Sequence, residues 1–397
     1  MREGWTETTL GQLVNIQKGK KPPAIDVYEE FSQPYLTADV LRGANCEQFV
    51  SAVLTESCVQ MSGHETVLLW DGAGAGDVFK SRPGILASTM AKVEAKNFPS
   101  VDSGFLYLYL YSKRVEIKSS CRGTTVPHVS PEALKSLSFA LPPLAEQKRI
   151  VDVVSSVDAY IDALQEQADT TRTARNAVLH ELISAGGDDW TETTIGSECI
   201  VKGGKRLPKG TPWSENPTTH PYIRATDFRN GRIDTSNLVY VPEDVWPVVS
   251  RYVVQAGDVL ITIAGTIGAI ALVPSSHIGA NLTENAALIR PASASLDSEF
   301  LYLWLLSDDA QRQIADLTIG TTQQKLGLFR IESIQLRLPP LDEQKRIVEI
   351  VLSMDDVVQK TEQALTDAKN LRSGLLSDLL SGDHEIPESY DVFVGAA

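Results

Sequence analysis

Cysteine is scarce in this 397-residue sequence, which contains 4. The four lie far apart and no two are spaced as Cys-x-x-Cys, so the sequence offers neither a zinc ribbon nor a disulfide framework. Sparse, scattered thiols are typical of a reducing compartment, and we expect a cytoplasmic protein. The 6 histidines are equally isolated. We therefore expect no metal site.

Long apolar segments are also lacking. The most apolar stretch, 259–273, is interrupted by glycines and threonines and is shorter than the ~20 residues of a membrane-spanning helix. It predicts two short strands around a tight turn. The first residues show no basic stretch followed by an apolar run, so we expect neither a secretory signal nor a membrane location.

The motifs of the enzymes that act on DNA are missing as well. There is no Asn/Asp-Pro-Pro-aromatic motif, which adenine methyltransferases use to hold a flipped base, and no Gly-x-x-x-x-Gly-Lys-Ser/Thr motif of nucleotide-driven motors. The glycine-rich run 72–76 is followed by Asp77 and predicts a turn. Glu146-Gln-Lys148 has the appearance of part of a nuclease site but is better interpreted as a helix start. We expect no catalytic residue and no cofactor.

Positive charge is in short supply, since the net charge is −15. Most of this negative net charge lies in two segments: residues 141–189 and 338–397 together carry −12, with 9 basic and 21 acidic residues. The two large remaining segments are close to neutral. The acidic balance is therefore only weak evidence against nucleic-acid binding.

What the sequence does contain is an internal repeat of one unit, present in two copies. The run Trp5-Thr-Glu-Thr-Thr-Leu-Gly returns at Trp190 as Trp-Thr-Glu-Thr-Thr-Ile-Gly, 185 residues later. The run Leu-Pro-Pro-Leu-Ala-Glu-Gln-Lys-Arg-Ile-Val at 141–151 returns at 338–348 with ten identities in eleven, 197 residues later. The second copy therefore holds about a dozen additional residues. The looser sequence between these anchors is explained either by modules with different targets or by ordinary divergence.

A long amphipathic helix is predicted after each Leu-Pro-Pro-Leu. Apolar residues recur at alternating steps of four and three, from Ile150 to Leu182 and again from Ile347 to Leu379, which is the seam of a coiled coil. Proline at each start and Gly186-Gly187 and Gly382 at the ends agree with helix termini. An antiparallel pair is the simplest arrangement. Arg175 and Arg372 interrupt the two seams at equivalent positions, either to set the register or as solvent-facing residues.

We divide the chain accordingly into two modules of α/β (α+β) type, 1–140 and 187–337, two helices, 141–186 and 338–382, and a tail, 383–397. A helical stretch is expected near 298–317. The tail resembles the start of a further copy; it either closes against the N-terminus or is a disordered acidic segment.

Candidate DNA contacts are basic, amide or hydroxyl side chains in loops at matching places of the two copies. Lysine and arginine on glycine-rich backbone suit phosphates, arginine suits guanine and glutamine suits adenine. The candidates are Lys18, Lys20, Lys21, Arg42, Thr124, Thr125 and His128 in the first module and Lys202, Lys205, Arg206, Lys209, Arg224, Arg229, Arg232, Thr321, Thr322, Gln323, Gln324 and Lys325 in the second.

The duplicated Leu-Pro-Pro-Leu-x-Glu-Gln-Lys-Arg-Ile-Val motif, each followed by a heptad helix, resembles the specificity subunit of type I restriction–modification systems. The resemblance implies two target-recognition domains in a pseudo-twofold, circular arrangement, each recognising half of a bipartite, asymmetric site in double-stranded DNA. It also implies two methyltransferase subunits and restriction/translocase subunits as partners. The docking residues that it implies are Leu141, Pro142, Pro143, Leu144, Glu146, Gln147, Leu338, Pro339, Pro340, Leu341, Glu343 and Gln344. The alternatives are a DNA-targeting subunit of another methyltransferase assembly (type IIB/IIG-like) and a coiled-coil scaffold that binds no DNA.

Overall fold

The computed structural model describes residues 4–22, 30–96, 100–123, 125–318, 320 and 324–391. The chain divides into two compact units, Met1–Gln165 with Gln363–Ala397, and Glu166–Glu362. Each unit consists of one globular module together with about half of each of the two long helices, α6 (Leu144–Ala185) and α12 (Leu341–Ser381). The units are described separately below.

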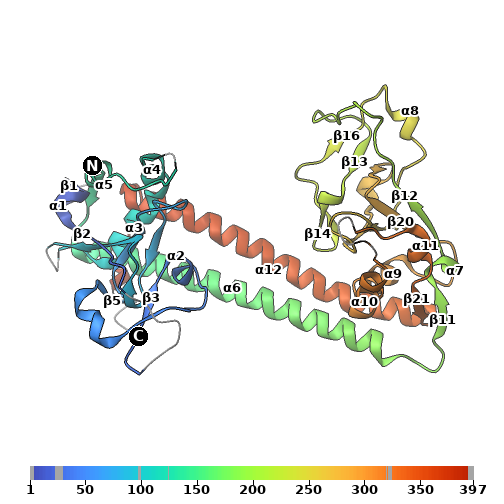
Figure 1. Ribbon diagram of the computed structural model, residues 1–397, viewed down its shortest axis with the longest axis horizontal. Coiled ribbons are helices and arrows are strands. Elements are labelled where there is room, and N and C mark those ends of the chain that lie inside the picture. Colours follow the sequence, from blue (N-terminus) through green and yellow to red (C-terminus); the bar gives the residue numbers. More distant parts are fainter. Residues whose placement is uncertain are drawn as a thin grey trace. The chain divides into compact units, whose positions relative to one another are not determined.

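The module of the first unit is built around two four-stranded sheets and a two-stranded ribbon (Figure 1). One sheet has the antiparallel order β2-β9-β6-β7, the other has the order β4-β3-β8-β5 with β3 and β8 parallel, and β1 pairs with β10. The strands are β1 (Thr6–Thr9), β2 (Val14–Lys18), β3 (Gln33–Leu36), β4 (Phe49–Val50), β5 (Gln60–Ser62), β6 (Thr66–Leu69), β7 (Val78–Lys80), β8 (Pro83–Leu86), β9 (Met90–Ala95) and β10 (Ser138–Leu141).

Five short helices accompany these sheets: α1 (Leu10–Leu13), α2 (Ala38–Leu41), α3 (Ser103–Ser112), α4 (Arg114–Ser119) and α5 (Pro131–Lys135), with a 3-10 helix at Ala52–Ser57. The apolar helix α3 packs between the first sheet and the long helices, because its Phe105 and Leu106 share one core with Ile150 of α6 and Leu376 of α12. A second core, around Tyr35 and Ile85, lies between the two sheets.

The second unit repeats this plan. Its sheet β12-β20-β17-β18 has the same antiparallel order as β2-β9-β6-β7, its sheet β16-β13-β19 contains the parallel pair β13–β19, and β11 pairs with β21. A hairpin, β14-β15, is added. The strands are β11 (Thr191–Thr194), β12 (Cys199–Gly203), β13 (Pro221–Ile223), β14 (Phe228–Arg229), β15 (Arg232–Ile233), β16 (Val239–Tyr240), β17 (Val259–Thr262), β18 (Ile270–Leu272), β19 (Asn281–Leu282), β20 (Ala286–Pro291) and β21 (Gln335–Leu338).

The helices of this unit are α7 (Ile195–Glu198), α8 (Trp246–Val249), α9 (Ser298–Leu305), α10 (Asp308–Leu317) and α11 (Leu328–Glu332), with 3-10 helices at Ala225–Asp227 and Ser275–His277. The apolar stretch 259–273 forms the paired strands β17 and β18, as predicted. The helix expected near 298–317 is two helices. Leu306 ends the first, and the Ser307 hydroxyl accepts a hydrogen bond from the Ala310 N–H and so starts the second.

The long helices begin and end where the sequence predicts. Each starts directly after the second proline of Leu-Pro-Pro-Leu, and the glycines that follow them, Gly186 and Gly382, have φ angles of 56° and 77°. These left-handed angles suit glycine, which carries no Cβ. Among the described residues, no helix is both long and apolar enough to cross a membrane.

Within each unit the two helix halves run antiparallel, and an arginine–aspartate pair joins them (Figure 1). In the second unit, Arg175 of α6 binds Asp355 of α12, with Nε–Oδ1 and Nη2–Oδ2 distances of 2.9 and 3.1 Å. In the first unit, Arg372 of α12 binds Asp158 of α6 in the same two-bonded manner, with an Nη2–Oδ2 distance of 3.0 Å. Of the two alternatives for these arginines, the geometry favours the register-setting one.

The tail packs against the first turns of α6 in the first unit, where Ile386 is buried in the core. Arg149 of α6 donates a hydrogen bond to the Ile386 carbonyl (3.2 Å) and binds Asp391 (2.8 Å). The Tyr390 hydroxyl donates to Asp152 at 2.6 Å. The described part of the tail is therefore an ordered part of the first unit.

Candidate nucleic-acid interface

In each unit, the Trp-Thr-Glu-Thr-Thr motif of the module contacts the Leu-Pro-Pro-Leu motif at the start of the long helix. The indole Nε1 of Trp5 donates to Glu146 at 3.0 Å, and that of Trp190 donates to Glu343 at 3.1 Å. Both carboxylates lie in the first turn of a helix, where the dipole favours negative charge. The two sequence repeats thus form one contact, made once in each unit.

The glutamine next to each glutamate is fully buried and makes three hydrogen bonds inside its module. Gln147 accepts from the Asp102 N–H (2.8 Å) and donates to the carbonyls of Ser100 and Pro142. Gln344 makes the same bonds with Asp297, Ser295 and Pro339. Asp102 and Asp297 cap α3 and α9, so each glutamine positions the apolar helix of its module.

These contacts reduce the number of predicted docking residues that are accessible to a partner protein. Glu146, Gln147 and Gln344 are buried, Glu343 is half-buried, and all four side chains bond inside their own modules, so they do not form an exposed docking surface. Among the other predicted docking residues, Pro142, Leu338 and Pro339 are buried, Leu141, Leu144 and Leu341 are half-buried, and Pro143 and Pro340 are exposed.

The loops that follow β2 and β12 occupy matching positions. The N–H of Gly19 donates to the Met90 carbonyl at 2.9 Å, and that of Gly204 donates to the Ala286 carbonyl at 3.0 Å. A Cβ at either glycine would overlap backbone carbonyl oxygens, of Ala87 in the first case and Thr283 in the second. The repeated glycines therefore bring basic side chains against the ends of β8 and β19. These side chains, Lys20, Lys21, Lys202, Lys205, Arg206 and Lys209, are exposed.

In the first module, further basic residues surround the turn at 71–77. Lys18 Nζ lies 2.6 Å from Asp71, whose backbone pairs with that of His128. Asp77 binds Arg42 at 2.6 Å and Lys118 at 2.5 Å. Burial alone would raise the pKa of Asp77, but these two cations hold that pKa below its usual value. The glycine-rich run is thus a turn, as predicted.

Lys118 was missed by the sequence reasoning, because it has no counterpart in a repeated motif and its partner Asp77 is 41 residues away. Thr125 and His128 are exposed beside this turn. Thr124 lies outside the described residues.

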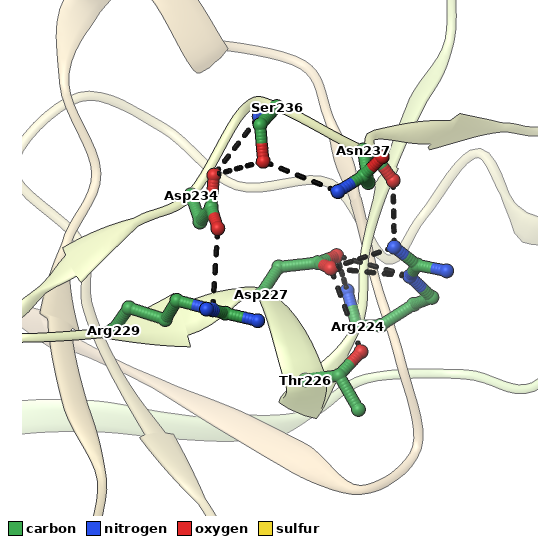
Figure 2. A network of polar contacts seen from close by, with 7 residues as sticks. All are labelled: Arg224, Thr226, Asp227, Arg229, Asp234, Ser236 and Asn237. Carbon is green, nitrogen blue, oxygen red and sulfur yellow. Dashed lines mark hydrogen bonds and ion pairs between the residues drawn. The ribbon is translucent and has the colours of Figure 1, made fainter. Parts of the chain in front are cut away.

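In the second module, Arg224 belongs to a polar network with the hairpin β14-β15 (Figure 2). Its guanidinium binds both carboxylate oxygens of the buried Asp227, and its Nη2 donates to the Asn237 carbonyl at 2.7 Å. Asp227 also accepts from the Arg224 N–H at 2.8 Å. Arg224 therefore holds the start of the hairpin, which is a structural use that the sequence reasoning did not foresee.

The hairpin carries the other two predicted arginines. Arg229 binds Asp234 at 3.2 Å with 70% of its side chain exposed, and Arg232 Nη1 donates to Gln359 of α12 at 3.0 Å. Arg206 binds Glu284, and Lys205 lies over the Tyr252 ring.

Gln324 and Lys325 are exposed. The backbone of Lys325 forms an antiparallel β-bridge with Ala264, as that of His128 does with Asp71 in the first module. Thr321, Thr322 and Gln323 lie outside the described residues. The described candidates thus lie in three matching segments of the two modules, and Lys18, Arg42 and His128 of the first module meet around the turn at 71–77.

Comparison with known proteins gives one consistent result. The family model described as the type I restriction modification DNA specificity domain matches residues 2–170 and 187–368. The MjaVIII type I restriction enzyme specificity subunit of Methanocaldococcus jannaschii is 28% identical over 402 residues, covering 96% of this chain and 93% of the relative. The EcoBI specificity subunit of Escherichia coli is 23% identical, covering 96% and 87%. The crystal structure of a type I S subunit from M. genitalium shares the fold, with a TM-score of 0.59, 18% identity and coverage of 96% and 97%.

Proposed function

Because the chain belongs to the type I restriction modification DNA specificity domain family, we propose that it is the DNA-recognising subunit of a type I restriction–modification complex. Each module recognises one half of a bipartite, asymmetric DNA site. The family description assigns DNA specificity, not catalysis, to such a chain. One observation carries the proposal: a single scaffold is built twice, and its matching loops carry different side chains.

The difference between the loops is what an asymmetric site requires. Lys20 and Lys21 in the first module correspond to Lys205 and Arg206 in the second, and Arg42 corresponds to Arg229. The backbone that presents them is held by the same glycine contacts. Exposed lysines and arginines supply phosphate contacts, while arginine and amide side chains distinguish bases in the major groove.

The partners in this proposal are double-stranded DNA, two methyltransferase subunits and restriction/translocase subunits, and the compartment is the cytoplasm. The helices α6 and α12, with the exposed Pro143 and Pro340 beside their starts, provide the docking surface for methyltransferase subunits. The modules are residues 1–140 and 187–337. The arginine–aspartate pairs fix the helix register, and the helices thereby set the gap between the half-sites.

Mapping of methylated bases tests the proposal directly. Cells that produce this chain together with a partner adenine methyltransferase should acquire one new split motif, with two short halves and a fixed gap. Cells with the methyltransferase alone are the control. No new methylation, when both proteins are present and bound to each other, would refute the specificity role and favour a scaffold.

Exchange of one module tests the assignment of the halves. Replacement of residues 187–337 by the second module of another family member should change one half of the motif and preserve the other half. A change in both halves would contradict independent recognition by the two modules.

A further inference from the structure

A cavity of 800 Å³ lies in the first unit between α3, α4 and the two long helices. Its walls carry tyrosines and cations: Tyr107, Tyr111, Lys113, Arg114, Lys369 and Arg372. One carboxylate, that of Asp158, also lines it and is paired with Arg372. Four cations and one carboxylate thus line the cavity, and Lys113 also binds Glu116 at 3.1 Å, outside the lining.

The aromatic rings of this groove are held between cations. The guanidinium of Arg114 lies 4.3 Å from the centre of the Tyr111 ring, and that of Arg372 lies 5.4 Å from it. Lys80, at the end of β7, lies 5.1 Å from the Tyr107 ring. These contacts hold Arg114 and Arg372 in place before any ligand arrives, which lowers the entropic cost of binding an anion there.

The residues at the equivalent position of the second unit have a different charge and are covered. Tyr302 corresponds to Tyr107, but Asp308 and Asp309 stand where Lys113 and Arg114 stand in the first unit. The hairpin β14-β15 also covers this place: a Cβ on Gly231 would overlap the Tyr302 hydroxyl, and the neighbouring Arg232 reaches α12. The tyrosine is accordingly buried in the second unit and half-buried in the first. The cationic groove is thus a feature of the first unit.

The groove and the proposed DNA-recognition loops of the same unit share one structural element. Helix α4 connects them, because Arg114 at its first residue lines the groove and Lys118 binds Asp77 beside Arg42. The step of four residues from Arg114 to Lys118 is an advance of about 6 Å along a helix. One DNA strand carries a phosphate about every 3.4 Å along the duplex axis, so this step corresponds to about two phosphates.

We propose that this groove is a sequence-independent binding site for DNA backbone phosphates, present in the first unit and absent from the second. It rests on the proposed function, since it extends the surface by which that unit contacts its half-site. Lys113, Arg114 and Lys369 contact phosphates, and Tyr107 and Tyr111 keep the groove open and the cations aligned.

The test uses the full chain in complex with its methyltransferase. In a Lys113→Gln/Lys369→Gln variant, which leaves the pairs around Tyr111 intact, the slope of log affinity against log salt on a random-sequence duplex should become shallower by about 1.8, from two lost phosphate contacts. The control is Arg251→Gln/Arg312→Gln, which removes the same charge from exposed positions of the second module, outside the two long helices. Its slope should equal that of the unchanged chain.

Phosphate-ethylation interference then locates the contact. Ethylated phosphates beside the half-site of the first unit should weaken binding of the unchanged complex and not of the groove variant, while those beside the other half-site affect both equally. An unchanged slope and pattern would overturn the proposal. Loss of methyltransferase binding, with DNA affinity intact, would instead make the groove a protein-docking site. A shallower slope in a complex that methylates no split motif would preserve the groove and refute the proposed function.

Discussion

The arginine–aspartate pairs between the long helices give the most quantitative prediction. Asp355→Asn removes the carboxylate from a pair whose side chains are 10% exposed at Arg175 and 25% exposed at Asp355. Removing one partner of a fully buried pair costs about 3–5 kcal/mol, whereas an exposed pair contributes about 0–1 kcal/mol. The intermediate burial places the expected loss at about 2 kcal/mol.

The loss should be confined to the second unit, because Asp355 and Arg175 both belong to it. Hydrogen exchange of peptides from 170–185 and 345–360 measures the free energy of local opening there. The double exchange Arg175→Asp/Asp355→Arg should recover most of the loss. The equivalent change in the first unit, Asp158→Asn, should have a similar effect on peptides of that unit, since Asp158 is 30% exposed.

A matched control separates this effect from general surface charge. Lys360 and Asp356 form an i,i+4 pair on α12 with 76% and 57% of their side chains exposed. Lys360→Gln should leave the exchange of the same peptides nearly unchanged. If the charge exchange of Arg175 and Asp355 stabilises no better than either single change, the pair does not set the helix register.

Three further outcomes follow from the described contacts. Gln147→Ala and Gln344→Ala each remove the three hydrogen bonds of a fully buried amide, and should lower the unfolding free energy by about 2–3 kcal/mol in urea denaturation. Gly19→Ala and Gly204→Ala should each cost about 1–3 kcal/mol of stability from overlap with the facing backbone, and should weaken DNA binding in gel-shift assays. Burial alone would raise the pKa of Glu65, but hydrogen bonds from Ser62 and Ser81 lower it to about 2. The stability from Glu65 should thus be complete above about pH 4.5 and lost on acidification toward pH 2, a loss missing from Glu65→Gln in pH-dependent unfolding.

The parts of the fold that depend on neighbouring residues were predictable from the sequence. Heptad spacing, the prolines before the helices and the glycines after them act over a few residues, and both helices begin and end as expected. The paired strands at 259–273 follow from one apolar run with a central turn. The repeats also marked the two motifs that contain Trp5 and Glu146. They did not indicate that these two residues contact each other.

The roles of the polar motif residues were harder to predict, because they depend on burial. Glu146 is 141 residues away from Trp5, and two of the partners of Gln147 lie 45 and 47 residues earlier in the chain. Without knowledge of the fold, a glutamate followed by a glutamine at the start of a helix fits an exposed docking surface as well as a buried contact. Arg224 and Asp227, by contrast, are three residues apart, and that spacing was available as a signal of local pairing.

The two copies within one chain separate scaffold from recognition. Where the module meets its helix, both copies keep the same tryptophan, glutamate and glutamine, and the same hydrogen bonds follow. At the start of α4, by contrast, Lys113 and Arg114 are replaced by Asp308 and Asp309 at the start of α10, and a hairpin covers what is a groove in the other unit. A buried bond tolerates little change, since each lost partner costs the desolvation of the other. Exposed side chains carry no such cost, and this freedom permits one scaffold to hold two surfaces of different charge.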